Sequence, residues 1–136
     1  MNTQVRNNSI RLLATGLVTF FLLAGFAMAA SHGGSHMSGQ FAGAKANTGT
    51  VEHFYDGGKS MLKVSDDFKV PDTPAPTWRI VDSKGNIYTL DAFKIKGGEK
   101  RQIVVPAFVH DIAKVQVYCA WAEVLLGETS FSAPVK

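Results

Sequence analysis

Short runs of β-forming residues, separated by Gly and Pro, fill the chain after Gln40. Residues 50–55 and 60–64 flank Asp56-Gly57-Gly58, which indicates a β-hairpin. Residues 77–81 and 86–90 flank Ser83-Lys84-Gly85, which indicates a second one. No window longer than about ten residues in this part shows the apolar spacing of three and four that is typical of a helix. The pattern therefore restricts the fold to strands.

Further β-forming segments lie at 92–95, 102–105, 115–121 and 129–131, and three prolines make 70–76 a crossing loop. About eight short strands with Gly/Pro punctuation predict an all-β fold. We expect an antiparallel β-sandwich, with a small barrel as the alternative, formed by a single domain over residues 41–136. The alternation within the strands predicts a core that contains Val51, Leu62, Val64, Ile80, Ile87, Val104, Val117 and Trp121.

The first 29 residues have the pattern of a secretory signal peptide. Arg6 and Arg11 precede an uncharged apolar segment at 12–26, and Ala27-Met28-Ala29 is a small-x-small cleavage pattern. The alternative is an uncleaved membrane anchor, because residues 12–30 contain no charge and almost reach the ~20 apolar residues that a spanning helix needs. Residues 30–40 are small and polar, so we expect a flexible leader. This organisation predicts a periplasmic or secreted protein.

Charge gives no indication of a nucleic-acid ligand. The chain has 14 basic and 11 acidic residues, and the expected signal segment carries two of the basic ones. The remaining residues are almost neutral and contain no run of like charge to follow a phosphate backbone. We therefore expect no nucleic-acid partner, and membrane contact only if the signal segment is uncleaved.

Cys119 is the only cysteine of the chain, although an exported domain normally pairs its cysteines. On an extended strand Val115, Val117, Cys119 and Trp121 share the more apolar face, which should point to the core. A thiol in apolar surroundings has a raised pKa and is inert. Core packing is thus one interpretation of Cys119, and a reactive or ligating role, with Tyr118 and Trp121 adjacent, is the other.

The order of several motifs resembles the DM-thirteen domain family. Phe41 and Asn47-Thr48-Gly49-Thr50-Val51 resemble the opening of the family pattern, and residues 62–68 resemble its leucine-containing strand that ends in Asp-Phe. Residues 90–106 and the closing Val115-Gln116-Val117-Tyr118-Cys119 with Leu126-Gly127 follow in the same order. Ala75-Pro76-Thr77 departs from the family, which usually has Gly-Pro-Asp there. The resemblance implies a small extracellular β domain whose cysteine is associated with electron transfer.

Several residues are candidates for holding a cofactor. Cys119 has the ligand chemistry for a haem or metal held non-covalently, with His53, His110 or Met61 as the second ligand. Cleavage after Ala29 would also place His32 third from a free amine, a pattern that binds copper or nickel, with His36 and Met37 as auxiliary groups. Covalent haem attachment is excluded, because the chain lacks Cys-x-x-Cys-His.

Two function classes remain. The sequence has no Gly-x-Ser-x-Gly, no His-Glu-x-x-His and no phosphate-binding loop, so we do not expect a stand-alone enzyme. The first class is a redox accessory module that uses Cys119, or a cofactor beside it, with a redox partner protein in the envelope. The second is a non-catalytic β-sandwich, structural or binding a protein or glycan, with Cys119 as core filler.

Overall fold

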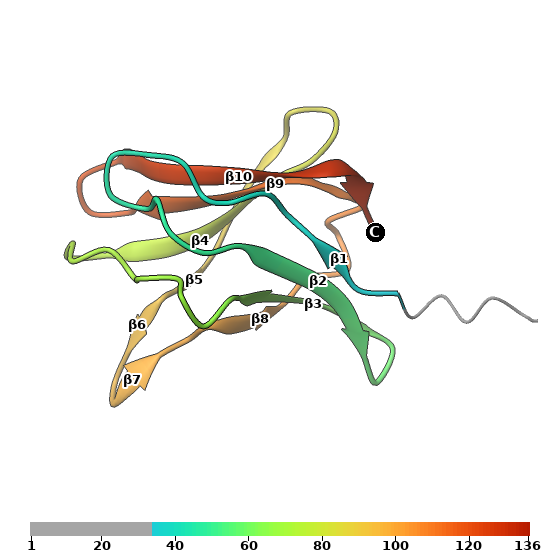
Figure 1. Cartoon of the computed structure of the whole chain (residues 1–136), viewed down its shortest axis with the longest axis horizontal. Coiled ribbons are helices and arrows are strands. Elements are labelled where there is room, and N and C mark those ends of the chain that lie inside the picture. The colour runs from blue at the N-terminus through green and yellow to red at the C-terminus, as the bar shows by residue number, and fades with distance from the viewer. Residues whose placement is uncertain (1–33) are drawn as a thin grey trace, which may run out of the picture. The chain divides into compact units, whose positions relative to one another are not determined.

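The computed structural model describes residues 34–136, which form two packed antiparallel sheets (Figure 1). The β-sandwich prediction is confirmed, and the sheets do not close into a barrel. The first sheet has the order β1 (His36–Met37), β2 (Val51–Asp56), β3 (Lys59–Val64) and β8 (Gln102–Val104). The second has the order β10 (Val124–Val135), β9 (Ile112–Cys119), β4 (Pro76–Val81) and β5 (Ile87–Ala92).

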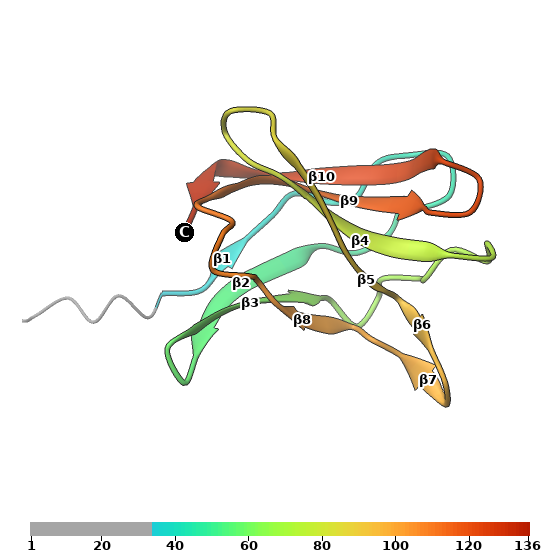
Figure 2. The same ribbon diagram turned by 180° about the vertical axis from the view of Figure 1, so that it is seen from behind.

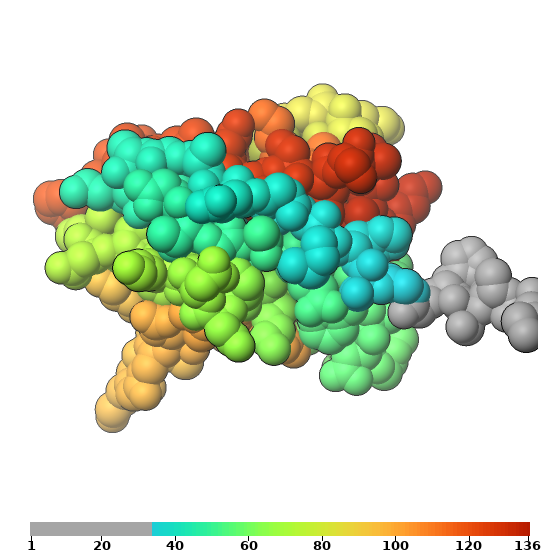
Figure 3. Space-filling view, viewed as in Figure 1, coloured from blue at the N-terminus to red at the C-terminus, as the bar shows by residue number. Residues whose placement is uncertain are grey.

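A small two-stranded ribbon, β6 (Lys94–Ile95) with β7 (Gly98–Glu99), joins the two sheets. Seen from behind in Figure 2, the chain passes from β5 through this ribbon to β8. The ribbon projects from the body of the domain in the space-filling view (Figure 3). Among residues 34–136 no helix is long and apolar enough to cross a bilayer. The expected signal segment and His32 lie outside the described residues.

Both predicted hairpins are present. The β2–β3 turn has positive φ at Gly57 (53°) and Gly58 (76°), as a two-residue hairpin turn with the twist of its strands requires. In the β4–β5 turn, the Asp82 carboxylate accepts hydrogen bonds from the backbone N–H groups of Lys84 and Asn86. The Asn86 side chain donates to the same carboxylate and is the largest cause of the lowered pKa of Asp82.

The segment that we expected to be a flexible leader belongs to the fold from His36 onward. β1 pairs with β2, and the Ser38 hydroxyl accepts a hydrogen bond from the Val51 N–H at 2.8 Å. The next residue, Gly39, and then Ala42 donate their N–H groups to carbonyls of β10. The segment therefore links an edge of each sheet, which composition alone did not reveal because its hydrogen bonds come from the backbone and from small polar side chains.

Five of the eight predicted core residues are buried, and three are not. Val51, Leu62, Val64, Ile80 and Val117 are fully buried. Ile87 is 52% exposed, because Tyr88 and Leu90 are the residues of β5 that pack on the core. Val104 is 48% exposed, since Ile103 is the inward residue of β8 and pairs with Leu62. Trp121 is 76% exposed because β9 ends at Cys119 and the chain turns there.

Four aromatic side chains form a continuous row through the core. Ring centroids are 4.9 Å apart for Phe41 and Phe68, 5.5 Å for Phe68 and Phe93, and 4.4 Å for Phe93 and Trp78. All four are buried. The indole N–H of Trp78 donates to the Lys100 carbonyl at 2.9 Å, so this buried donor is satisfied. The row connects the N-terminal segment, the loop after β3, the junction between β5 and β6, and the central strand β4.

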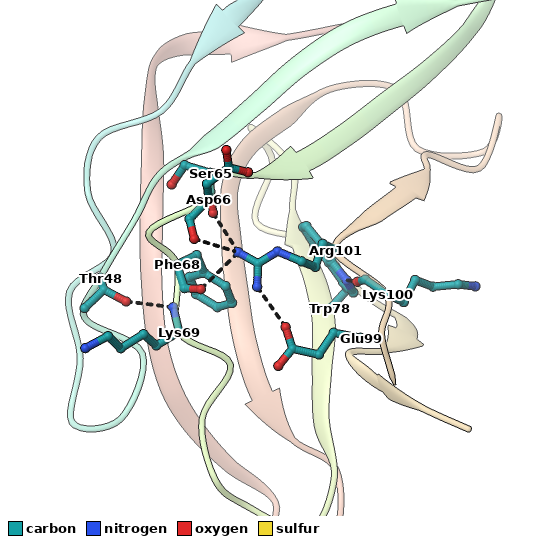
Figure 4. Close-up of polar contacts among 9 residues, drawn as sticks. All are labelled: Thr48, Ser65, Asp66, Phe68, Lys69, Trp78, Glu99, Lys100 and Arg101. Carbon is teal, nitrogen blue, oxygen red and sulfur yellow. Dashed lines mark hydrogen bonds and ion pairs between the residues drawn. The ribbon is translucent and has the colours of Figure 1, made fainter. Parts of the chain in front are cut away.

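Arg101 fastens the loop after β3 beside this row (Figure 4). Its guanidinium donates to the carbonyls of Ser65 at 2.8 Å and Phe68 at 3.0 Å, and forms an ion pair with Glu99 at 2.8 Å. Figure 4 also shows the Lys69 N–H donating to the Thr48 hydroxyl. Because the loop carbonyls bond to a cation, the backbone on either side of Phe68 is fixed, and with it the position of the Phe68 ring.

We expect Phe93→Ala to lower the free energy of unfolding by about 3–5 kcal/mol, because it removes the ring between Phe68 and Trp78 and leaves a cavity. The matched control is Phe108→Ala, since Phe108 is 62% exposed. Its effect should stay within about 0.5 kcal/mol. Urea denaturation measures both, and equal effects of the two substitutions would contradict this description of the core.

Candidate functional site

Cys119 is the last residue of β9 and points into the sandwich. It pairs with Pro76 of β4 and Val124 of β10, and its side chain is only 1% exposed. The expected inward orientation is confirmed. Because the chain has no second cysteine, this thiol forms no disulfide within the chain.

A tight turn lies between β9 and β10, directly after the cysteine. Ala120 donates its N–H to the Ala75 carbonyl at 3.0 Å, which ties the turn to the loop before β4. Glu123 has a φ of 55°, a left-handed conformation that is strained for a residue other than glycine. The turn that covers the end of β9 therefore contains a strained residue.

Polar groups from both neighbouring segments lower the pKa of the Cys119 thiol. The largest effect comes from the Ala122 N–H, and the N–H groups of Ala75 and Trp121 and the Thr73 hydroxyl act in the same direction. Together they outweigh burial, which raises the pKa. The Thr73 hydroxyl oxygen is buried and has no partner of regular hydrogen-bond geometry among residues 34–136. These polar groups act against the raised pKa that apolar surroundings alone would give.

The aromatic residues next to Cys119 in sequence do not surround its sulfur. Tyr118 lies on the outer face of its sheet, where the Arg79 guanidinium is 4.1 Å from the ring centroid. Trp121 extends into solvent, with the neighbouring Val124 and Leu125 also exposed. The turn thus carries an apolar surface on the outside and a covered thiol on the inside.

The histidines and Met61 lie away from the cysteine. His110 lies two residues before the start of β9, and Cys119 is the last residue of that strand. The strand itself is roughly 23 Å long at 3.3 Å per residue. His53 packs on Phe131, which lies between Ser130 and Val135, the residues of β10 that pair with the start of β9. Met61 neighbours the inward-facing Leu62 and so points to the other side of its sheet.

A haem or metal bridging Cys119 and one of these residues therefore does not fit this arrangement. The second ligand would have to come from the opposite end of the sandwich or through a sheet. Within residues 34–136 no three side chains of His, Cys, Asp or Glu lie close enough together to hold a metal ion. The thiol has to be considered by itself.

His53 is fully buried on β2 and has mixed surroundings. Its Nε2 is 2.8 Å from the Ser60 hydroxyl, and its ring lies 5.9 Å from the ring of His36 and 5.5 Å from that of Tyr55. Burial, and to a smaller extent His36, lowers the pKa of His53, so its neutral form is favoured. The alternation with Val51 indicates the inward orientation, but no sequence pattern indicates the pairing with His36.

His110 lies exposed in the loop between β8 and β9. The carboxylate of the adjacent Asp111 accepts hydrogen bonds from the N–H and the hydroxyl of Ser83, both at 2.7 Å, and thereby links the β8–β9 loop to the β4–β5 turn.

A groove of about 490 Å³, which the sequence did not predict, lies beside the β8–β9 loop. Its walls come from the tip of the β2–β3 hairpin, the β8–β9 loop and the end of β10.

We expect the free energy of unfolding to fall as the pH is lowered from about 6.5, the ordinary histidine pKa. The folded protein binds a proton at His53 less readily than the unfolded chain does, because burial lowers the pKa of His53. The neutral imidazole therefore stabilises the fold fully above about pH 6.5, and this stabilisation is lost as the pH falls to the pKa of the folded state. His36 and Tyr55 are the titratable neighbours. Denaturation at several pH values should show a smaller loss for His53→Phe, whereas the exposed control His110→Gln should follow the wild type. An unchanged loss in His53→Phe would refute the assignment.

Comparison of the chain with protein-family models, with curated proteins and with solved structures finds no match. The resemblance to the DM-thirteen domain family remains an expectation from sequence motifs. The candidate site is therefore defined by its own geometry, a buried thiol at the end of β9, beside the loop before β4 and the turn at 120–123.

Proposed function

We propose that this domain is an exported, redox-associated accessory module in which the thiol of Cys119 exchanges electrons with a partner protein. The observation that carries the proposal is the setting of the sulfur. It lies at the end of β9 under a short turn, with backbone N–H groups of Ala75 and Ala122 and the hydroxyl of Thr73 as its polar neighbours. Such donors favour a thiolate over a thiol.

The chemistry open to a lone thiolate is exchange with a disulfide. The Cys119 sulfur attacks one sulfur of a partner's disulfide, a new sulfur–sulfur bond forms, and the old one breaks with its electron pair on the departing thiolate. A thiolate of a second partner protein then attacks the first partner's sulfur in this mixed disulfide. Cys119 departs with the electron pair as a thiolate, and a disulfide remains between the two partners. Since the sulfur is covered, the turn at 120–123 has to open first, and the strain at Glu123 lowers the cost of opening.

Two sequence features support this function. The resemblance to the DM-thirteen family implies a cysteine at this strand position that is associated with electron transfer. The signal-like pattern at residues 1–29 implies an oxidising compartment, periplasmic or extracellular, where a redox partner with a disulfide is available. No step is assigned to haem or copper at Cys119, because the other candidate ligands lie elsewhere.

The exposed apolar surface of the turn favours a second candidate function, a non-catalytic module that binds a protein or glycan. Trp121, Val124 and Leu125 are all exposed there. Tryptophan is enriched among the residues that dominate binding energies at protein interfaces. In this case Cys119 fills the core, and Cys119→Ala leaves binding intact while Trp121→Ala weakens it.

Reaction with oxidised glutathione separates the two functions. We expect the folded protein to form a mixed disulfide at Cys119 at a rate that hardly changes with low concentrations of urea, because opening the turn exposes little surface. Mass spectrometry measures the product. Cys119→Ala should fold normally and give none, and Tyr118→Phe, on the opposite face, should react as the wild type does. Modification that occurs only through urea-dependent global unfolding would refute the redox function and leave the binding module.

A further inference from the structure

His36 on β1 and His53 on β2 lie opposite each other at the N-terminal edge of the first sheet. They are direct partners in the antiparallel pairing of β1 with β2, so their side chains lie on the same face of the sheet. Their ring centroids are 5.9 Å apart and the ring planes differ by 24°. His53 is fully buried, whereas His36 is exposed. The pair thus joins the interior to the surface.

One ring nitrogen of His53 has no partner. Ser60 is hydrogen bonded to Nε2, but Nδ1 is buried and lacks a hydrogen-bond partner among residues 34–136. A buried polar atom without a partner loses its hydrogen bond to water and gains none in return, so it calls for an explanation. The neighbouring rings of Tyr55 and Phe131 make aromatic contacts with His53 and give no hydrogen bond to Nδ1.

The contact with Ser60 suits a metal-binding imidazole. When the Nε2–H donates to the Ser60 hydroxyl, Nδ1 carries the lone pair that a metal needs, and a hydrogen bond at the other nitrogen is the usual arrangement of ligating histidines. Two metal–nitrogen bonds of about 2.0 Å place the ring nitrogens about 4 Å or less apart. This spacing is compatible with rings 5.9 Å apart, because the exposed His36 side chain is free to adjust.

We propose that His36 and His53 together bind a copper ion at the N-terminal edge of the sandwich, with solvent completing the coordination on the side of the exposed His36. Imidazole nitrogens suit copper, nickel and zinc, and copper(II) binds most tightly among the divalent ions of this series. Within residues 34–136 no carboxylate cluster adjoins the pair, which disfavours calcium and magnesium. The site lies at the other end of the sandwich from Cys119 and is independent of the proposed redox function.

Titration of the protein with copper(II) tests this site. All variants carry His32→Ala, so that the N-terminal histidine does not compete for the ion. We expect one strongly bound copper per chain, an electron paramagnetic resonance spectrum with coupling to imidazole nitrogen, and a higher melting temperature with copper. His36→Ala should weaken binding about tenfold or more and abolish the thermal shift.

Two control variants bear on the assignment. His110→Gln and Cys119→Ala should bind copper as the parent protein does, because neither residue touches the pair. His53→Phe should abolish the nitrogen coupling, and its circular dichroism spectrum shows whether it is folded. The proposal fails if no copper binds at one per chain, or if His36→Ala binds it as tightly as the parent. It also fails if Cys119→Ala, and not His36→Ala, loses the ion, which would assign copper to the thiol.

Discussion

The stacking of Trp78 on Phe93 is the interaction on which the rest of the domain depends. The two rings lie 4.4 Å apart in the core, and Phe68 and Phe41 extend the row toward the N-terminal segment. Phe93 also donates its N–H to the Pro76 carbonyl, and Pro76 in turn pairs with Cys119. The aromatic row thereby fixes the start of β4 against the end of β9. It holds the loop that contains Thr73 and Ala75 next to the thiol.

The two ends of the sandwich have different chemistry. At the end of β9 a buried sulfur lies near backbone N–H groups and a hydroxyl that lower the pKa of the thiol. At the N-terminal edge a buried imidazole lies beside an exposed one, which favours a bound cation. Since separate strand ends build them, a substitution at one end should leave the other unchanged. This separation makes the two proposals independently testable.

The sequence predicted those features that depend on local alternation and turn chemistry. The two hairpins follow from their Gly-containing turns, and the burial of Val117 and Cys119 follows from the period of the strand. Ile87 and Val104 were misplaced because apolar residues occupy both faces of their strands. A pattern of period two then does not identify the inward face. Trp121 was misplaced because the turn after Cys119 contains no Gly or Pro to mark it.

Features formed by segments distant in the sequence could not be predicted from the sequence alone. The residues that lower the pKa of Cys119 come from the turn at 121–122 and from a loop more than forty residues earlier, at Thr73 and Ala75. Their effect depends on the pairing of β4 with β9, which no local pattern specifies. The pairing of His36 with His53 depends likewise on the N-terminal segment joining the sheet, although its composition is that of a flexible leader.

The pKa of the Cys119 thiol is the quantity that most directly tests the central claim, namely that polar donors at the end of β9 stabilise a thiolate. The ultraviolet absorbance of the thiolate, followed against pH with Cys119→Ala as the blank, measures it without requiring access to the sulfur. We predict a midpoint below that of the same thiol in the urea-unfolded protein, and a higher midpoint in Thr73→Val, which lacks the hydroxyl. A midpoint in the folded wild-type protein at or above that of the unfolded protein, unchanged in Thr73→Val, would contradict the claim and leave Cys119 as an inert part of the core.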